Sequence, residues 1–273
     1  MNLAESYRHC QRIARSTGKN FYYSFLVMPA EKRAAMCAIY AFMRRSDDIA
    51  DSSANPVEGL RQWRAALDRQ DSSDPILPAL FDTVERYRIE RRYFHELLDG
   101  TMMDQTKIRY ETFDELYRYC YHVASVVGLI VLPVFGYKDQ AALVPAEACG
   151  IAFQLTNILR DVKEDAAMGR VYLPGEDLRR FGVAERDLME GRMTPAFEEL
   201  MRFEAARARK YYREAQPLLG MIERDSRATL AVMIAIYSGI LDKLERRQYR
   251  VFDEKVRLSA LEKCWIVAKH WRP

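Results

Sequence analysis

The fold is decided by one stretch of sequence, Asn157-Ile158-Leu159-Arg160-Asp161-Val162-Lys163-Glu164-Asp165. Within it Asn157, Asp161 and Asp165 recur every four residues, and such positions lie one above the other on an α-helix. The apolar residues between them, and Ala152-Phe153-Gln154-Leu155 before them, predict that part of this helix is buried. The stretch therefore predicts a row of three oxygen-bearing side chains on a partly buried helix.

A second acidic block, Asp47-Asp48-Ile49-Ala50-Asp51, repeats the four-residue step between Asp47 and Asp51. One such row alone is typical of a solvated helix face, whereas two matched rows indicate a function. Carboxylates gathered in one place repel each other and need cations. Mg²⁺ is commonly held by one or two carboxylates together with substrate phosphates and water. The two rows predict a diphosphate held by Mg²⁺, with Mn²⁺ as the alternative ion, between two acidic helices.

Basic residues accompany both rows. Arg44 lies three residues before Asp47 and therefore shares its helix face, and Arg160 directly precedes Asp161. Ordinary surface ion pairing is one interpretation, and such pairs contribute little to stability. The other is that the arginine forks bind diphosphate oxygens. The spacing alone leaves both interpretations open.

Composition sets the broad class. The chain has 273 residues, 49% hydrophobic and 30% charged, with a net charge of +3, which is an ordinary globular balance and too neutral to favour a nucleic-acid partner. The five cysteines lack metal-ligand spacing and are expected to be buried free thiols in a reducing compartment. No signal peptide is seen, and the longest apolar run, 123–136, is too short to span a bilayer. We expect a cytoplasmic protein.

The hydrophobic pattern is helical almost throughout. Helices are expected over residues 3–16, 30–51, 140–164, 194–216 and 226–248, with further helix starts at Asn55-Pro56, Asp74-Pro75, Thr112 and Ser259. Residues 19–25 form a short aromatic stretch, and Asp99-Gly100 lies between helical patterns. No segment alternates as a strand does. The two rows are far apart in sequence, so we predict a single all-α domain over residues 1–273 with its site between helices.

Aromatic residues suit an isoprenoid pocket, although at helical spacing they belong more often to the core. The set comprises Phe21, Tyr22, Phe25, Tyr40, Phe42, Tyr119 and Tyr121. Their π-faces attract cations and so favour a site that generates carbocations. Other catalytic schemes find no support, since the sequence has no serine-nucleophile elbow, dinucleotide fingerprint or P-loop, and its four histidines show no paired ligand spacing.

At this point the chain resembles the squalene/phytoene synthase family of head-to-head prenyl transferases, from about residue 5 to 260. The matching pieces are Phe21-Tyr22-Tyr23-Ser24-Phe25, Ala38-Ile39-Tyr40-Ala41-Phe42 with Arg44 and the block 47–51, Tyr119-Cys120-Tyr121-His122-Val123-Ala124-Ser125-Val126-Val127-Gly128, the stretch 154–165, and Gly169-Arg170-Val171-Tyr172-Leu173-Pro174. The resemblance implies an all-α isoprenoid-synthase bundle with a central cavity. It also implies condensation of two prenyl diphosphates through a cyclopropylcarbinyl diphosphate.

The resemblance also implies roles for individual residues. The metal and diphosphate ligands become Asp47, Asp51, Asn157, Asp161 and Asp165, and the four aspartates among them count as catalytic. Tyr119 matches a tyrosine proposed to assist proton removal or to stabilise the cation. Candidate diphosphate contacts are Lys19, Asn20, Arg44, Arg160, Tyr237 and Lys255. The substrate pocket becomes Phe21, Tyr40, Val123, Val127, Gly128 and Gln154.

Three residues depart from the family pattern. Asn20 stands where serine is frequent, so an amide replaces a hydroxyl. Ser125 replaces a common glycine, which would crowd the pocket or alter a close helix contact. Lys255 stands where arginine is frequent, so a point charge replaces a fork. None of the three touches the acidic rows.

The product is less defined than the reaction class. The overall likeness favours bacterial enzymes that use two farnesyl diphosphates, giving presqualene diphosphate or squalene for hopanoid synthesis. The alternatives are dehydrosqualene from the same pair and phytoene from two geranylgeranyl diphosphates. NADPH is expected only if squalene is the end product, and a monomer and a homodimer both stay open. A catalytically silent isoprenoid carrier and a single-substrate terpene cyclase are the competing classes.

The C-terminal stretch 261–272 combines apolar bulk with Lys263, Lys269 and Arg272. Its Trp265 and Trp271 are of the type enriched at bilayer interfaces. Either this helix packs on the bundle with its charges in water, or it gives weak, reversible peripheral contact with the inner face of the membrane.

Overall fold

The computed structural model of the protein describes residues 2–52 and 54–270, with residues 19–21 and 52 described by their backbone alone. Its first half contains α1 (Leu3–Thr17), α2 (Lys19–Phe25), α3 (Ala30–Ser52), α4 (Pro56–Asp68), α5 (Leu77–Tyr87), α6 (Arg92–Thr106), α7 (Phe113–Cys120), the π-helical turn η1 (Tyr121–Ser125) and α8 (Val126–Phe135). Its second half contains the 3₁₀ turn η2 (Gln140–Ala142), α9 (Leu143–Ala167), α10 (Gly175–Phe181), α11 (Glu185–Met189), α12 (Pro195–Ala215), α13 (Leu218–Met221), α14 (Arg224–Arg246) and α15 (Ala260–His270).

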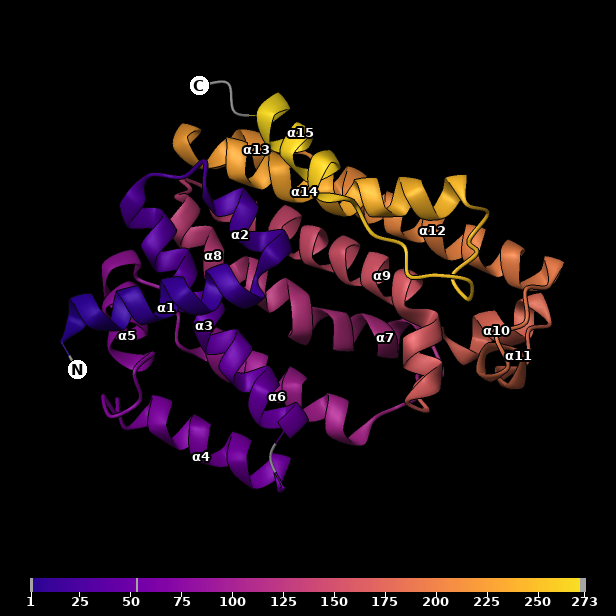
Figure 1. The fold of residues 1–273 in the computed structure, drawn as a ribbon, viewed down its shortest axis with the longest axis horizontal. Coiled ribbons are helices and arrows are strands. Elements are labelled where there is room, and N and C mark those ends of the chain that lie inside the picture. The colour runs from indigo at the N-terminus through magenta and orange to yellow at the C-terminus, as the bar shows by residue number, and fades with distance from the viewer. Residues whose placement is uncertain (1, 53, 271–273) are drawn as a thin grey trace.

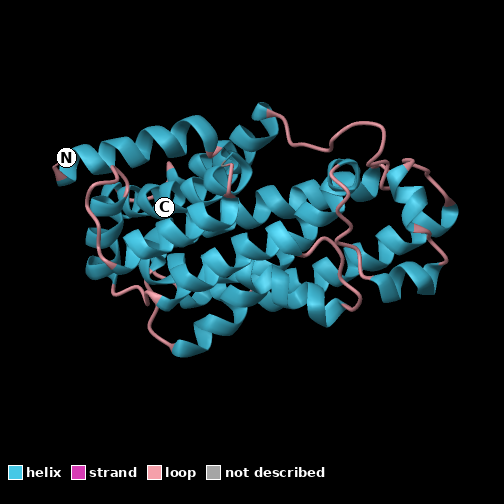
Figure 2. Ribbon diagram, turned by 90° about the horizontal axis from the view of Figure 1, so that it is seen from below, coloured by secondary structure: helices cyan, strands magenta, loops and turns pink. Residues whose placement is uncertain are grey.

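The all-α prediction is confirmed (Figure 1). Residues 2–52 and 54–270 contain no strand, only two isolated bridges, which join Arg109 to Val171 and Tyr137 to Ile222. Figure 2 shows the helices joined by loops that lie mostly at the edge of the molecule.

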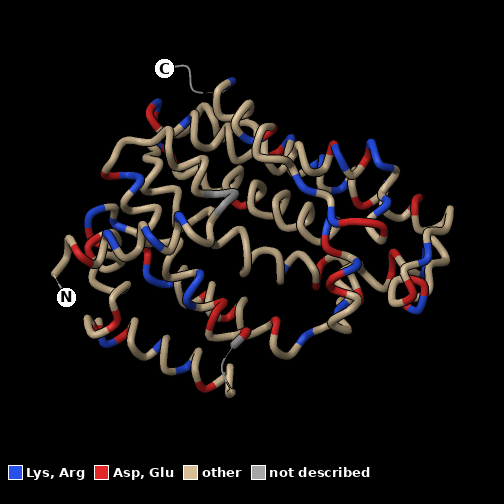
Figure 3. Tube along the Cα trace, in the orientation of Figure 1, with Lys and Arg blue, Asp and Glu red and all other residues tan. Residues whose placement is uncertain are grey.

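Apolar residues of the two halves fill two adjoining parts of the core. Helices α1, α3 and α5 pack against one another in the first part, and α9, α12 and α14 in the second. The stretch around Asn157 lies on α9, whose apolar face is buried at Ile151, Leu155 and Ile158, among others. Charged residues are sparse along the central helices and frequent on the outer ones (Figure 3). Burial of one face thus fixes which side of α9 is left for the acidic row.

Several helix ends follow the signals read from the sequence. Asn55 and Thr194 each accept a hydrogen bond from the third amide of the helix that follows. Ser259 and Glu262 form a reciprocal capping box, because each backbone amide donates to the other side chain. These caps satisfy amides that the first helical turn leaves unpaired.

Residues 19–25, described from the sequence as a short aromatic stretch, form helix α2, and its Phe25 is buried in the core. Two local predictions were wrong. Asp99-Gly100 lies inside α6, where a Cβ on Gly100 would come within 2.9 Å of the His122 backbone, so the glycine permits a close crossing. Asp74-Pro75 precedes rather than opens α5, since the Asp74 carboxylate accepts from the Ile76 amide in a turn.

The helix in the apolar segment before Gly136 does not end at Gly128 or Pro133. The helix passes both and stops at Phe135, where Gly136 adopts a φ of +76°. The irregular turn is η1, five residues of π-helix before Val126, a feature frequent at functional sites. By length and composition alone the stretches Phe113–Phe135 and Gln140–Ala167 reach the size of a membrane span. Most of each is packed inside the bundle, as core helices often are.

Ser125 alters a helix contact and does not line the pocket. Its hydroxyl donates to the Glu147 carbonyl at 2.8 Å, and its side chain is fully buried. A Cβ on Gly150 would lie 2.4 Å from the Ser125 Cα, so α9 and η1 cross at the closest distance that glycine allows.

Candidate active site

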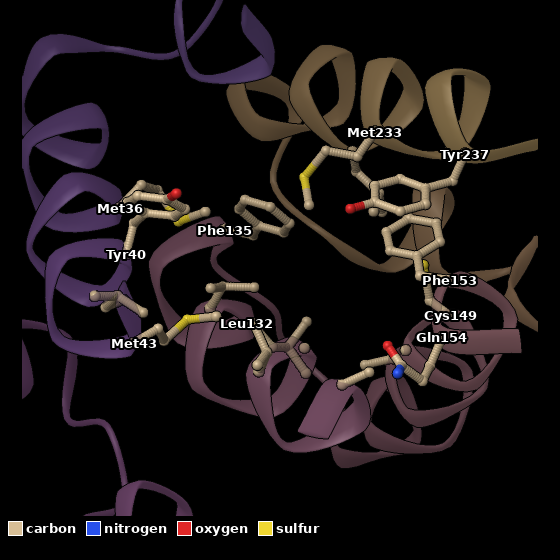
Figure 4. Close-up of a pocket in the computed structure, with 18 of the residues that line it drawn as sticks. Met36, Tyr40, Met43, Leu132, Phe135, Cys149, Phe153, Gln154, Met233 and Tyr237 are labelled. Atoms are coloured by element: carbon tan, nitrogen blue, oxygen red, sulfur yellow. The ribbon is translucent and has the colours of Figure 1, made fainter. Parts of the chain in front are cut away.

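A cavity of about 300 Å³ lies between the two halves of the chain and is lined by α2, α3, η1, α8, α9, α13 and α14. Figure 4 shows methionines and aromatic rings converging on it from α3, α8, α9 and α14. The rings of Phe153 and Tyr237 stack with centroids 4.3 Å apart. At its polar end the wall carries Asp47 from α3 and Asn157 from α9. The cavity is therefore an apolar chamber with oxygen ligands at its mouth.

Besides Asp47 and Asn157, six of the residues predicted from the sequence to bind substrate lie in the wall of this chamber. They are Tyr40, Val123, Val127, Gly128, Gln154 and Tyr237. Lys19, Asn20 and Phe21 belong to α2 by their backbone, and their side chains lie outside the described residues. Sequence reasoning missed most of the apolar wall, such as Met36, Met43 and Phe153, because these residues carry no signal beyond hydrophobicity.

The two acidic rows lie on α3 and α9, and of their members only Asp47 and Asn157 line the cavity. Each row has one carboxylate that resists ionisation. Burial, with the charges of Asp51 and Asp104, raises the pKa of Asp47 to about 7 despite Arg44 nearby. Burial and the Asp161 charge raise the pKa of Asp165 to about 7. Asp47 is nonetheless reached by solvent, because it opens on the cavity. A cation that prefers oxygen ligands would stabilise the ionised form of both carboxylates.

Asp161 is neutralised from two sides. Arg160 meets it with two donors, Nε at 2.9 Å and Nη2 at 2.5 Å, and the Lys255 Nζ lies 2.6 Å from its Oδ1. Although burial opposes ionisation, these two cations hold the pKa of Asp161 below its usual range. Lys255 also pairs with Glu164 at 3.3 Å. Arg160 and Lys255, two predicted diphosphate contacts, thus lie at the acidic row of α9, and the prediction that Lys255 does not touch the acidic rows was wrong.

Two buried polar atoms facing this region have no hydrogen-bond partner. One is the acceptor Oδ1 of Asn157, whose amide nitrogen donates to Gln154 at 3.3 Å. The other is the donor Nε of Arg44, whose Nη2 pairs with Asp48 at 2.5 Å. Buried polar groups are nearly always satisfied, so the orphaned acceptor of Asn157 in the cavity wall points to a bound ligand.

The oxygen atoms at the mouth of the cavity suit a hard cation that binds together with a phosphate group. Within the described residues no three His, Cys, Asp or Glu side chains converge closely enough to hold a metal by themselves. Asp47, Asn157 and Asp165 offer oxygen atoms only. Such a set, completed by phosphate oxygens and water, is what Mg²⁺ commonly uses.

A cluster behind the polar end was not found from the sequence. Asp104 on α6 accepts from the Tyr172 hydroxyl at 2.9 Å, and hydrogen-bonds Tyr119. Tyr119 is buried and lies outside the cavity wall, and Arg170 donates to the Asp104 carbonyl at 3.3 Å. Asp104 has no acidic neighbour at helical spacing, so no pattern marked it.

Comparison with known proteins agrees with this geometry. The family model for squalene/phytoene synthase matches residues 14–262. Phytoene synthase from Arthrospira platensis is 39% identical over 95% of this chain and 90% of its own length, and 15-cis-phytoene synthase from Synechocystis sp. is 36% identical over 99% and 86%.

Among solved structures, a dehydrosqualene synthase superposes with a TM-score of 0.92 at 35% identity, covering 98% of this chain and 96% of its own. Squalene synthase HpnC from Alicyclobacillus acidocaldarius gives 0.86 at 28% identity, covering 90% and 95%.

Fold and cavity together define an isoprenoid synthase, an all-α prenyltransferase. The chain belongs to the squalene/phytoene synthase family, whose members join two prenyl units head to head.

Proposed function

We propose that the protein joins two geranylgeranyl diphosphates to phytoene, a C40 hydrocarbon. The observation that carries this proposal is the run of relatives named phytoene synthase, 35–39% identical over at least 95% of the chain. The dehydrosqualene synthase, at 35% identity, supports the farnesyl alternative less strongly. The earlier preference for farnesyl diphosphate rested on overall likeness alone and stays open to the same test.

We further propose that Mg²⁺ acts at the mouth of the cavity, held by Asp47, Asp51, Asn157, Asp161 and Asp165 with substrate phosphates. When bound there, it would neutralise charge on the leaving diphosphate. Arg44 Nε, Arg160 and Lys255 supply the remaining donors, and the present pairing of the last two with Asp161 keeps them beside the site. Their charge-assisted hydrogen bonds would hold the diphosphate in place.

The apolar chamber supports the rest of the reaction. Its walls exclude water, which would otherwise capture an allylic cation. The stacked rings of Phe153 and Tyr237 present a π-face to the chamber, and such faces stabilise cations. Joining two such chains to phytoene releases two diphosphates and two protons and requires no hydride. The proposal therefore has no role for NADPH, which squalene formation would need.

The test is product analysis with purified protein and Mg²⁺. Geranylgeranyl diphosphate should give phytoene with the same yield whether NADPH is present or absent. A C30 hydrocarbon from farnesyl diphosphate, formed at a kcat/KM tenfold higher than phytoene, would transfer the assignment to the farnesyl alternative. A cyclic product from one substrate molecule would assign a terpene cyclase instead.

We also propose that the protein makes weak peripheral contact with an anionic membrane through α15. This helix is buried at Ile266, whereas Leu261 and Trp265 point outward with 82% and 64% of their surface exposed. The Lys269 ammonium lies 5.2 Å from the Trp265 ring centroid. One face of α15 packs on the bundle through Ile266, and the exposed Leu261 and Trp265 on its other side support the proposed contact. Trp271 and Arg272 lie outside the described residues.

Sedimentation with vesicles of anionic lipid tests this contact. Replacing Leu261 and Trp265 by serine should reduce the bound fraction at low salt at least threefold, because the apolar face supplies the insertion energy. Val144→Ser is the matched control, since Val144 is 74% exposed on α9. Equal binding of the double variant and the control would exclude α15 as the contact.

A further inference from the structure

Helix α1 carries a row of arginines that the proposed reaction does not use. Arg8, Arg12 and Arg15 follow one another at steps of four and three residues, so they lie on one face of the helix. All three are exposed, whereas Cys10 and Ala14 on the other side of α1 are buried in the core. The arginine row therefore faces outward from a helix that is packed on the bundle.

The arginine row lines a groove of about 550 Å³ between α1 and α2, together with Glu5, Gln11 and Tyr22. Among residues 2–52 and 54–270, no carboxylate forms an ion pair with any of the three arginines. Glu5, the one acid of the groove, instead accepts from the Asn2 backbone amide at 3.1 Å in the cap of α1. Three guanidinium groups that share a groove without a paired carboxylate attract anions.

The groove and the outward face of α15 lie on either side of α2, which packs against both α1 and α15 (Figure 1). A pocket of about 370 Å³, the outer pocket, lies between the two helices, since its lining includes Thr17 and Gly18 at the end of α1 and Lys263 on α15. Glu262, the acid of α15, pairs with Lys243 at 3.1 Å and is thereby neutralised. The combined surface is thus positively charged and carries the exposed apolar side chains of α15.

This surface borders the approach to the candidate active site. The outer pocket also contains Arg160 and Lys255, the proposed diphosphate contacts, and it shares Tyr40 with the wall of the apolar chamber. A prenyl diphosphate has an anionic head and an apolar tail, so in a bilayer its head lies among the lipid phosphates and its tail among the acyl chains. A protein face that binds lipid phosphates around the outer pocket would bring such heads to it.

We propose that Arg8, Arg12 and Arg15 bind the phosphate headgroups of an anionic bilayer, so that α1 and α15 together turn the outer pocket toward the membrane. This inference rests on the proposed membrane contact of α15. The apolar side chains of α15 enter the headgroup layer, and the arginine row lies along the lipid phosphates. Substrate then reaches the outer pocket directly from the bilayer.

Charge complementarity selects this partner. A row of unpaired cations along a helix matches a surface of anionic headgroups, and each basic residue near such a surface strengthens binding about fivefold. Guanidinium groups also form charge-assisted hydrogen bonds with phosphate oxygens. The arginine row therefore supplies electrostatic attraction, whereas α15 supplies apolar insertion.

The test is sedimentation of the intact protein with vesicles of anionic phosphatidylglycerol or neutral phosphatidylcholine. The test variant carries an Arg→Gln substitution at all three positions of the arginine row. The matched control combines Arg186→Gln, Arg213→Gln and Arg246→Gln, which removes the same charge from exposed arginines of α11, α12 and α14 that form no ion pair within the described residues. Circular dichroism checks the folded state of both variants.

The test variant should bind anionic vesicles about tenfold or more weakly at low salt, because three fivefold contributions are lost and salt screens part of them. The control should lose less than about threefold, and neutral vesicles should not distinguish the proteins. Turnover of geranylgeranyl diphosphate presented in anionic vesicles should fall in the test variant about fivefold or more. Its turnover in detergent solution should stay unchanged, because the arginine row does not line the chamber.

Two binding results would overturn this inference. Equal binding of the test variant and the control to anionic vesicles would make the arginine row a solvated helix face. Binding of inorganic diphosphate without Mg²⁺ that is lost in the test variant, with vesicle binding unchanged, would assign the row to a soluble polyphosphate. If the test variant unfolds, Arg8→Gln alone decides, with about fivefold weaker vesicle binding expected and unchanged binding contradicting the inference.

The experiment separates this inference from the proposed contact of α15. If the Leu261 and Trp265 double variant loses vesicle binding and the test variant does not, the contact stands and the role of the arginine row is refuted. If the unaltered protein does not sediment with anionic vesicles, the membrane contact itself is refuted.

Discussion

Asp161 and Asp165 lie one helical turn apart, yet replacing each by asparagine should change stability in opposite directions. The folded state raises the pKa of Asp165 from 3.8 to about 7, so the native chain prefers the neutral acid. Arg160 and Lys255 lower the pKa of Asp161, so the native chain prefers that carboxylate ionised. Asparagine mimics the neutral form, which suits the first position and not the second.

The magnitude follows from the pKa shift. A shift of about three units at 1.36 kcal/mol per unit sets a ceiling of about 4 kcal/mol on the cost of the Asp165 charge. Asp165 is half-buried, and water screens part of this cost, so we expect Asp165→Asn to stabilise the metal-free protein by about 1–2 kcal/mol at pH 8. That corresponds to a Tm higher by roughly 2–4 °C.

The sign depends on pH. Between the unfolded pKa near 3.8 and the folded pKa near 7, the native chain binds more protons than the unfolded chain, so its stability falls as pH rises through this window. The gain from Asp165→Asn should therefore be full at pH 8, fall to roughly a third at pH 5, and vanish below the unfolded pKa near 3.8. Asp161→Asn should instead lower stability at pH 8 by about 1–3 kcal/mol, because it removes hydrogen bonds to charged groups and leaves Arg160 unpaired.

The assay is thermal unfolding of both variants at pH 5 and pH 8 in the presence of chelator. Adding Mg²⁺ and pyrophosphate should raise the Tm of the unaltered protein more than that of Asp165→Asn. A Tm of Asp165→Asn equal to or below that of the unaltered protein at pH 8 would refute the electrostatic reasoning, as would stabilisation by Asp161→Asn.

Further predictions concern the metal row, the anion contact and the helix crossing. Asp47→Asn should abolish turnover measured as diphosphate release, with circular dichroism unchanged, and turnover near that of the unaltered protein would remove Asp47 from the metal site. Lys255→Ala should raise the KM for prenyl diphosphate about tenfold or more, because a charged hydrogen bond is lost. An unchanged KM would mean that Lys255 pairs with Asp161 and does not bind the diphosphate. Gly150→Ala should lower the free energy of unfolding by about 1–3 kcal/mol in a denaturant titration, since the new Cβ would meet the Ser125 backbone. An unchanged free energy of unfolding would show that the crossing of α9 and η1 can widen.

Periodic signals gave the positions of the acidic rows in advance. The four-residue step that joins Asn157 to Asp161 depends on helix geometry alone, and α9 is a helix over its whole length. The caps at Asn55 and Thr194 were likewise found from local chemistry. Features set by neighbouring residues in sequence were thus within reach of sequence reasoning.

Features that depend on contacts between distant segments could not be predicted from the sequence. Asp104 gains its partner Tyr172 from a segment 68 residues away, so nothing near either residue announces the pair. Gly100 was expected between helical segments, whereas it lies inside α6 and permits a close approach to His122. The pairing of Lys255 with Asp161 likewise depends on how the chain returns after α14.

The most direct measurement of the central claim is a competition in one vessel. The purified protein is incubated without NADPH in the presence of Mg²⁺ and equal concentrations of farnesyl and geranylgeranyl diphosphate. The C30, C35 and C40 hydrocarbons are then separated, identified and quantified by mass spectrometry. The account predicts that phytoene, the C40 product, predominates and that chelator abolishes all three. Predominance of a C30 product, or hydrocarbon formation that survives the chelator, would contradict it.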